Sequence, residues 1–203
     1  MRLTKKLFIL LVLFIQIFFV HGSVYAQEET LFESDVESGY FAGPVFKITE
    51  VNNRTSYMIG GRGGWIVNRK YTFGLGAYGL ISAVGAPAET RIEYNSPKLK
   101  MEYNYGGFEF VYIINSDNLI HYNLYSLFGL GSIELYSTKN INQHNDSFFV
   151  FEPAINVIVN VNPMIRIGMG ISYRILSGID TYGIESSDIS GIGGTITIKL
   201  GNF

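Results

Sequence analysis

A strict two-residue alternation near the carboxyl end of the chain constrains its fold more than any other feature. Between residues 164 and 176 the odd positions, such as Ile165, Ile167 and Ile171, are apolar, whereas the even positions, such as Arg166 and Arg174, are small or charged. Side chains of a β-strand point alternately to opposite faces. The pattern therefore predicts a long strand and excludes a helix.

The same alternation recurs along the chain and predicts an all-β fold. We expect strands at 39–50, 56–67, 71–84, 99–114, 119–136, 147–160, 164–176 and 189–202. Short turns at 68–70, 115–118 and 161–163 alternate with longer polar loops at 85–98, 137–146 and 177–188. Only the first connection, 51–55, breaks this alternation, because it is short where a long loop is expected. This arrangement predicts an eight-stranded antiparallel transmembrane up-and-down β-barrel with periplasmic short turns and both chain ends in the periplasm.

The amino-terminal segment has the organisation of a cleaved signal peptide. Basic residues precede an apolar run at 7–20, and Val24-Tyr25-Ala26 offers small residues to a signal peptidase. The run is too short for a spanning helix, so an uncleaved anchor is the weaker alternative. We expect a signal at 1–26, an acidic flexible periplasmic lead-in at 27–38 and the barrel at 39–203.

Composition narrows the class of protein. Removing residues 1–26 takes away three of the 15 basic residues and none of the 17 acidic ones, which leaves a net charge of −5 and no basic footprint for nucleic acid. The chain has no cysteine, so disulfide, thiol and lipobox chemistry are excluded. Only 16% of the residues are charged, against about 25% in soluble domains.

The polar face of the strands separates a membrane barrel from a soluble, lipocalin-like one. That face consists mainly of Gly, Ser, Thr and Asn, which suit a narrow lumen, whereas the other face carries bulky Ile, Leu and Phe, which suit lipid. Aromatic residues next to the short turns predict a girdle at the membrane interface. The girdle residues are Trp65, Tyr71, Tyr112 and Tyr122.

Strand 99–114 carries an irregularity. Its polar residues Lys100, Glu102 and Asn104 are even, but beyond Gly106-Gly107 the polar residue is Glu109. A phase slip at a glycine pair predicts a β-bulge there.

Several motifs resemble a family of small outer-membrane β-barrels of the Bacteroidota and their relatives. They are the segments 60–65 (GGRGGW), 74–79 (GLGAYG), 151–154 (FEPA), 170–174 (GISYR) and 199–203 (KLGNF). The resemblance covers nearly the whole chain after the signal. It implies an outer-membrane barrel without an assigned activity, inserted into lipid by the barrel-assembly machinery. Phe203 departs from the family pattern because it is out of phase with the apolar face of its strand.

Two motifs suggest chemistry without the context it needs. The segment Gly74-Leu75-Gly76-Ala77-Tyr78-Gly79 matches the G-x-G-x-x-G pattern of dinucleotide-binding sites. It lies inside an alternating strand, however, and no helix follows it. His121 faces the predicted lumen without a second histidine, which makes a poor metal site. Glu109 could reach His121 across the hairpin, but Ser126 and Ser132 have the opposite parity and provide no nucleophile. We therefore expect no catalytic residues, cofactor or metal.

The charges predicted to point inward are the most informative residues. They are Lys47, Arg62, Glu102, Glu109, Glu152, Arg166, Arg174 and Lys199. Folding the hairpin of strands 147–160 and 164–176 about Asn162 places Glu152 diagonal to Arg174. Folding the hairpin of strands 56–67 and 71–84 places Arg62 opposite Gly76, where a missing side chain leaves room. Because unpaired buried charge is costly, we expect these groups to pair and plug the lumen. A narrow polar conduit or a small-ligand pocket is the alternative.

Three functions remain open. The first is a non-enzymatic structural barrel, or one that interacts through its long loops with a partner that the sequence does not name. The second is a narrow channel or a binder of small or hydrophobic molecules. The third is a lipid-modifying enzyme, which lacks a convergent catalytic set.

Overall fold

The computed structural model describes residues 36–137 and 140–203, which form a closed antiparallel barrel of eight long strands with a two-residue strand beside it. The predicted signal peptide at 1–26 and most of the predicted lead-in lie outside the described residues. The elements are β1 (Ser38–Val51), β2 (Arg54–Val67), β3 (Tyr71–Leu80), β4 (Val84–Gly85), α2 (Ala88–Glu93), β5 (Lys100–Ile114), β6 (Ile120–Ser137), β7 (Asn140–Asn162), β8 (Ile165–Ser177), α3 (Ser186–Ile189) and β9 (Gly191–Asn202).

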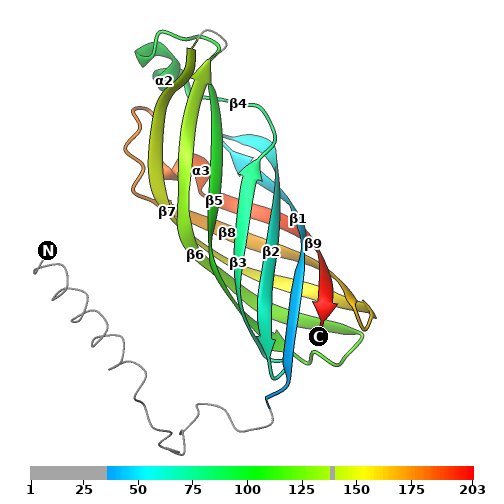
Figure 1. Ribbon diagram of the computed structural model, residues 1–203. Coiled ribbons are helices and arrows are strands. Elements are labelled where there is room, and N and C mark those ends of the chain that lie inside the picture. The colour runs from blue at the N-terminus through cyan, green and yellow to red at the C-terminus, as the bar shows by residue number, and fades with distance from the viewer. Residues whose placement is uncertain (1–35, 138–139) are drawn as a thin grey trace, which may run out of the picture. The chain divides into compact units, whose positions relative to one another are not determined.

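The sheet closes on itself and confirms the predicted eight-stranded fold. Neighbours run in the order β3-β2-β1-β9-β8-β7-β6-β5, and pairing of β3 with β5 completes the circle (Figure 1). Every pairing is antiparallel, and each of the eight strands pairs with a strand on both sides. Closure removes the exposed edges that an open sheet would leave.

The two ends of the barrel differ, as the turn lengths predict. The turns β2–β3, β5–β6 and β7–β8 lie at one end, here called the short-turn end, where β1 begins beside the end of β9 (Figure 1). The opposite, long-loop end carries residues 81–99 with β4 and α2, and residues 178–190 with α3. The β1–β2 connection at that end is a two-residue turn in which Asn52 and Asn53 have φ of 48° and 56°, a left-handed conformation that asparagine tolerates.

The predicted loop at 137–146 is wrong. β7 already begins at Asn140, and Glu134 pairs with Asn145, so the β6–β7 hairpin extends well beyond β8, whose pairing with β7 ends at Phe149. On the other side, β5 pairs with β6 as far as Tyr136. The residues there are polar and were expected to form a loop for that reason. A strand surrounded by water on its outer side can carry polar residues and still satisfy its backbone in the ladder.

The predicted bulge in β5 is also wrong. Gly107 pairs with Gly76 on one side and Gly129 on the other, and no register shift occurs between β5 and either neighbour. The odd side chains point inward along the whole strand, from Met101 to Ile113. The register shifts in the described strands lie instead at 135–137 and at 160–162.

A change of polarity along β5 imitates the phase slip. Towards the long-loop end the outward residues Lys100, Glu102 and Asn104 are polar, and the inward residues Met101 and Tyr103 belong to a buried apolar core. From Phe108 onwards the outward side chains are apolar. The pleat is therefore continuous, and only the outer face changes from polar to apolar, because Val111 and Ile113 keep the inner face largely apolar.

The barrel has an apolar core inside, which reaches Phe41 and Ile113 towards the short-turn end, and an apolar belt outside. The core at the long-loop end includes Met58, Leu135, Phe148 and Ile189, with α3 contributing the last of these. The outer belt leaves large apolar side chains exposed. Its members include Phe46, Leu75, Phe108, Phe128, Ile155, Ile171, Ile196 and Ile198. None of the helices formed by residues 36–137 and 140–203 is long and apolar enough to cross a membrane.

Phe203 does not follow the outer belt. β9 ends at Asn202, and the Phe203 ring stacks on the inward-facing ring of Phe41 with centroids 6.4 Å apart. The parity mismatch in the sequence therefore corresponds to a ring packed on the inner side of the wall.

Candidate functional site

A cluster of charged and tyrosine side chains crosses the barrel interior. Two carboxylates, Glu109 on β5 and Glu152 on β7, each form an ion pair and accept hydrogen bonds from tyrosine hydroxyls. Both carboxylates are about 1% exposed. We call these residues and their partners the interior cluster.

The first pair joins opposite walls. Nζ of Lys47, on β1, donates to both carboxylate oxygens of Glu152 at 2.9 Å. The hydroxyl of Tyr105 donates to Oε2 of Glu152 at 2.6 Å, and the Lys47 ammonium lies 3.6 Å from the centroid of the Tyr78 ring. Two strands, β9 and β8, separate β1 from β7 in one direction around the wall and four strands separate them in the other, so this pair spans the lumen.

The second pair passes over a glycine. Arg62 on β2 is the register partner of Gly76 on β3, and Nη2 of Arg62 lies 2.8 Å from Oε2 of Glu109. This approach falls outside hydrogen-bond geometry, so charge attraction holds it. A Cβ atom on Gly76 would collide with the Glu109 carboxylate. The space above Gly76 is thus used by Glu109, whose Oε1 also accepts hydrogen bonds from Tyr78 and Tyr125 at 2.6 and 2.9 Å.

Arg174 on β8 secures the long-loop end. Its Nε and Nη2 donate to the carbonyl oxygen of Ile189 at 3.1 and 2.6 Å, and Nη2 also reaches Oγ1 of Thr49 at 3.2 Å. The backbone N–H of Asn52 donates to the carbonyl of Asp188 at 2.7 Å. These bonds hold α3 and its loop over the interior, with Ile184 and Ile189 packed into the core.

The predicted pairing of Glu152 with Arg174 is wrong. Glu152 forms its ion pair with Lys47, and Arg174 donates hydrogen bonds to the carbonyl of Ile189, to Thr49 and to the sulfur of Met58. Register does not cause the change, because β7 and β8 pair Phe151 with Ile175 and Ala154 with Ser172, which puts Glu152 and Arg174 side by side. The carboxylate of Glu152 instead binds the ammonium of Lys47, and the guanidinium of Arg174 binds the carbonyl of Ile189 in α3.

The eight charged residues that were predicted to point inward fall into three groups in the structure. Lys47, Arg62, Glu109, Glu152, Arg174 and Lys199 are buried inside the barrel. Arg166, half-buried, lies opposite Lys199 at the short-turn end, with its guanidinium 4.1 Å from the centroid of the Phe203 ring. Glu102 is exposed on the outer wall because β5 has no bulge, and its prediction as a lumen residue is wrong.

The interior tyrosines were missed by sequence reasoning. Tyr78 and Tyr125 share the parity of inward residues, so their strand patterns contained the signal. For Tyr105 the predicted inward Glu102 was misleading, because it implies by parity an outward Tyr105. All three hydroxyls complete the coordination of the carboxylates.

The four predicted girdle residues lie next to the short turns. Trp65 and Tyr122 are about half exposed, and Tyr71 and Tyr112 pack together across the β3–β5 ladder with centroids 5.7 Å apart. Each side chain points outward.

His121 does not join Glu109. It is buried near the short-turn end, where Nδ1 lies 3.4 Å from the carbonyl of Asn118, whereas Glu109 is the register partner of Leu127. Among the described residues no group of three or more His, Cys, Asp or Glu side chains converges as a metal site.

Little free space remains around the interior cluster. A cavity of about 10 Å³ lies between Lys47, Arg62, Glu152 and the polar residues Asn156 and Thr197. That volume suits roughly one water molecule.

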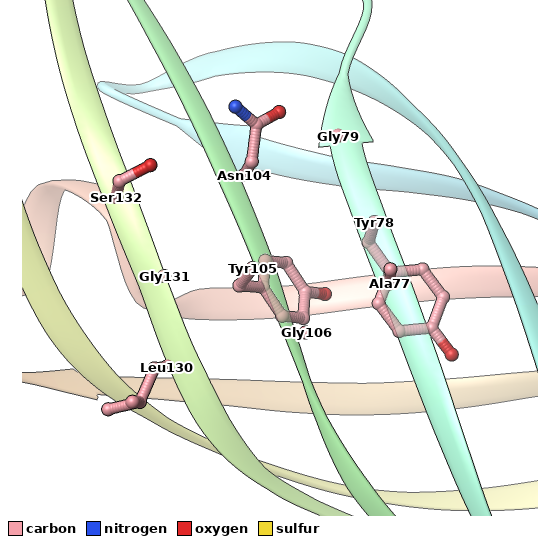
Figure 2. A pocket seen from close by; sticks show the side chains of 9 residues that line it. All are labelled: Ala77, Tyr78, Gly79, Asn104, Tyr105, Gly106, Leu130, Gly131 and Ser132. Carbon is pink, nitrogen blue, oxygen red and sulfur yellow. The ribbon is translucent and has the colours of Figure 1, made fainter. Parts of the chain in front are cut away.

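A larger hollow lies on the outer wall of β3, β5 and β6. Figure 2 shows this outer-wall groove of about 580 Å³, where the small residues Ala77, Gly79 and Gly106 lie beside Leu130. Asn104 and Ser132 are register partners at its upper rim. The groove therefore lies where the apolar belt meets the polar part of the wall.

These features define the class of protein: a small barrel with the fold of outer-membrane β-barrels. Neisserial surface protein A matches with a TM-score of 0.58 at 10% identity, over 82% of this chain and 97% of that one. The N-terminal β-barrel domain of Pseudomonas aeruginosa OprF matches with a TM-score of 0.54 at 8% identity, over 81% and 96% of the two chains. No family model and no curated protein matches the sequence.

Proposed function

We propose that this chain is a non-enzymatic protein of the bacterial outer membrane with a structural role or an interaction role carried by its long loops. The exposed apolar belt would contact lipid. Residues 1–26 would be removed, and the barrel-assembly machinery would insert the remaining chain. Its amino and carboxyl termini would then both lie on the periplasmic side. The proposal includes the kinship to the Bacteroidota family that the sequence motifs suggest.

The observation that carries the proposal is the filled interior. Two ion pairs and three tyrosine hydroxyls occupy the middle of the lumen, and the cavity beside them holds about one water molecule. An eight-stranded barrel is only wide enough for its own side chains. The charge pairs therefore act as a plug, and the loops rather than the lumen are left to meet partners.

Single-channel conductance tests the plug. Purified wild-type protein in planar bilayers should show no resolved channel at moderate voltage. A variant with Lys47→Ala, Tyr105→Ala and Glu152→Ala, which removes one crossing pair, should show small, steady openings. A wild-type conductance as large as that of the triple variant would contradict the plug and favour a conduit.

The outer-wall groove supports a second candidate, the binding of a small hydrophobic molecule. Its floor is apolar, and Asn104 and Ser132 offer hydrogen bonds at one end. Filling the groove with Ala77→Trp should abolish binding of a fluorescent fatty acid, whereas Ile171→Trp on the far wall should leave binding unchanged. Equal binding by both variants would eliminate the groove as the site.

A further inference from the structure

The charges inside the barrel do not balance. Among the described residues five cationic side chains face the interior, but only two carboxylates are buried there, since Asp146 at the long-loop end is part-exposed and accepts hydrogen bonds from Asp180 and Thr181. The cations are Lys47, Arg62, Arg166, Arg174 and Lys199, and the carboxylates are Glu109 and Glu152. Lys47 and Arg62 use the two carboxylates, and Arg174 is held by a carbonyl and a hydroxyl. Lys199 and Arg166 are the two interior cations that none of these groups binds.

These two cations face each other. Arg166 on β8 and Lys199 on β9 are direct register partners, and their side chains lie on the inner face at the short-turn end. Lys199 is only 6% exposed. Neither forms an ion pair or a hydrogen bond with any described residue; their contacts are aromatic rings. Like charges directly opposite one another are unfavourable, and a buried charge without a counter-charge is more so.

Two stacked rings bring a third cation to the same place. The Lys199 ammonium and the Arg62 guanidinium lie 4.7 and 5.9 Å from the centroid of the Phe41 ring, and Arg166 covers Phe203, which stacks on Phe41. Nε of Arg62 is buried without a hydrogen-bond partner among the described residues. Cation–ring contacts fix these groups but do not neutralise them.

The acidic residues of the short-turn end are committed elsewhere. Glu37 and Asp117 each lie 2.8 Å from the guanidinium of Arg69, and both are largely exposed. A cavity of about 200 Å³ opens at this end between Gly39, Ile66 and Phe203. Glu37 and Arg69 also line this cavity, and neither Lys199 nor Arg166 does. It adjoins the two cations through the Phe203 ring, which Arg166 covers, and offers space for a small solute at the mouth.

We propose that Lys199 and Arg166 form a binding site for a small inorganic oxyanion, such as phosphate, at the short-turn mouth of the barrel. A guanidinium can bind two oxygens side by side, and an ammonium adds a compact charge from the opposite strand. The bound oxyanion supplies the counter-charge that the interior lacks.

Nuclear magnetic resonance on the full chain in a phosphate-free detergent such as octyl glucoside tests the site. Sodium phosphate is titrated at constant ionic strength set with sodium gluconate, and the amide signals of Gly39, Ile66 and Phe203 are followed. Wild-type protein should show saturable shifts. Lys199→Met and Arg166→Gln should each weaken the affinity about tenfold or more, the loss expected for one charge-assisted hydrogen bond.

Lys70→Met is the matched control. Lys70 is an exposed cation in the β2–β3 turn at the same end, so the net charge changes equally, and this variant should keep the wild-type titration. Lys199→Met removes an uncompensated buried charge and should therefore fold; Arg166→Gln alters a half-buried side chain and is an independent check.

Three other outcomes are informative. Wild-type signals that do not respond to phosphate, or responses unchanged in Lys199→Met and Arg166→Gln, would overturn the proposal. Signals already at the phosphate-bound position in phosphatidylglycerol nanodiscs without added phosphate would support the same site, with a lipid headgroup as the source of the oxyanion. A response lost equally in Lys70→Met would reveal only diffuse attraction to net charge and would overturn the site.

Discussion

Arg62 and Glu109 meet across the top of Gly76, on the strand that lies between theirs. The ion pair at 2.8 Å exists because the intervening strand has no side chain at that position. Glu109 fills the vacant volume and is held there by Tyr78 and Tyr125. One glycine thus determines where a buried charge can lie.

Gly76→Ala should destabilise the barrel by about 1–3 kcal/mol, because the new methyl group displaces the carboxylate in a tightly packed interior. Urea unfolding in detergent micelles or liposomes measures the change. Gly194→Ala is the matched control, since a Cβ there meets nothing within 4 Å, and it should be neutral or slightly stabilising. Equal effects of the two substitutions would mean that Glu109 does not occupy the space above Gly76.

Lys47 and Glu152 should be strongly coupled. Lys47→Met or Glu152→Gln alone leaves a buried charge without its partner and should cost about 3–5 kcal/mol, less if water enters the lumen. The double variant should cost clearly less than the sum, and a double-mutant cycle on urea unfolding measures the difference. The cycle of Glu152→Gln with Arg174→Met should show much weaker coupling, because no ion pair joins those residues. The reverse ranking would contradict the pairing described here.

Arg174→Met should free α3 without unfolding the barrel. The side chain supplies two hydrogen bonds to the carbonyl of Ile189, and no other described side chain bonds to that carbonyl. Hydrogen exchange at residues 184–190 should accelerate by about tenfold or more, as expected for loss of a charged hydrogen bond worth at least 1.4 kcal/mol. Exchange in β1 and β9 should remain unchanged. Arg54→Met, an exposed arginine at the same end, is the control and should leave the 184–190 segment protected.

Single cysteines should report the change from polar to apolar along the outer face of β5. Glu102→Cys lies on the polar outer wall and should react rapidly with a charged, membrane-impermeant thiol reagent in liposomes. Phe108→Cys, further down the same outer face, should be shielded by lipid, and a fluorophore attached there should be quenched by brominated lipid. If Phe108→Cys reacts as fast as Glu102→Cys, the apolar belt does not contact lipid.

Sequence reasoning could predict the strands whose two faces differ consistently from end to end. In β8 and β9 every isoleucine is outside and every charge inside, so parity alone gives the orientation of Ile171, Arg174 and Lys199. β5 could not be solved in this way because its outer face is polar in one half and apolar in the other. The two-residue periodicity is intact in β5, but the outward side chains change from polar to apolar at Gly106-Gly107.

The partners inside the cluster were harder to predict than its members. Parity identifies Lys47, Arg62 and Glu152 as inward, but it does not say which charges lie at the same height in the barrel. That height depends on strand stagger, which the short turns only partly define. The tyrosines were overlooked because a phenol suits both a lipid-facing girdle and a buried hydrogen bond.

The closure of the barrel has a consequence for how the chain folds. β1 pairs with β9, so Tyr40 lies beside Asn202, and this ladder joins the two ends of the barrel sequence. Contacts so distant along a chain carry a large entropic cost and are slow to form. Until they form, β1 and β9 each expose a row of unpaired backbone groups. The seam between these two strands is therefore where a partly folded chain is most exposed to aggregation.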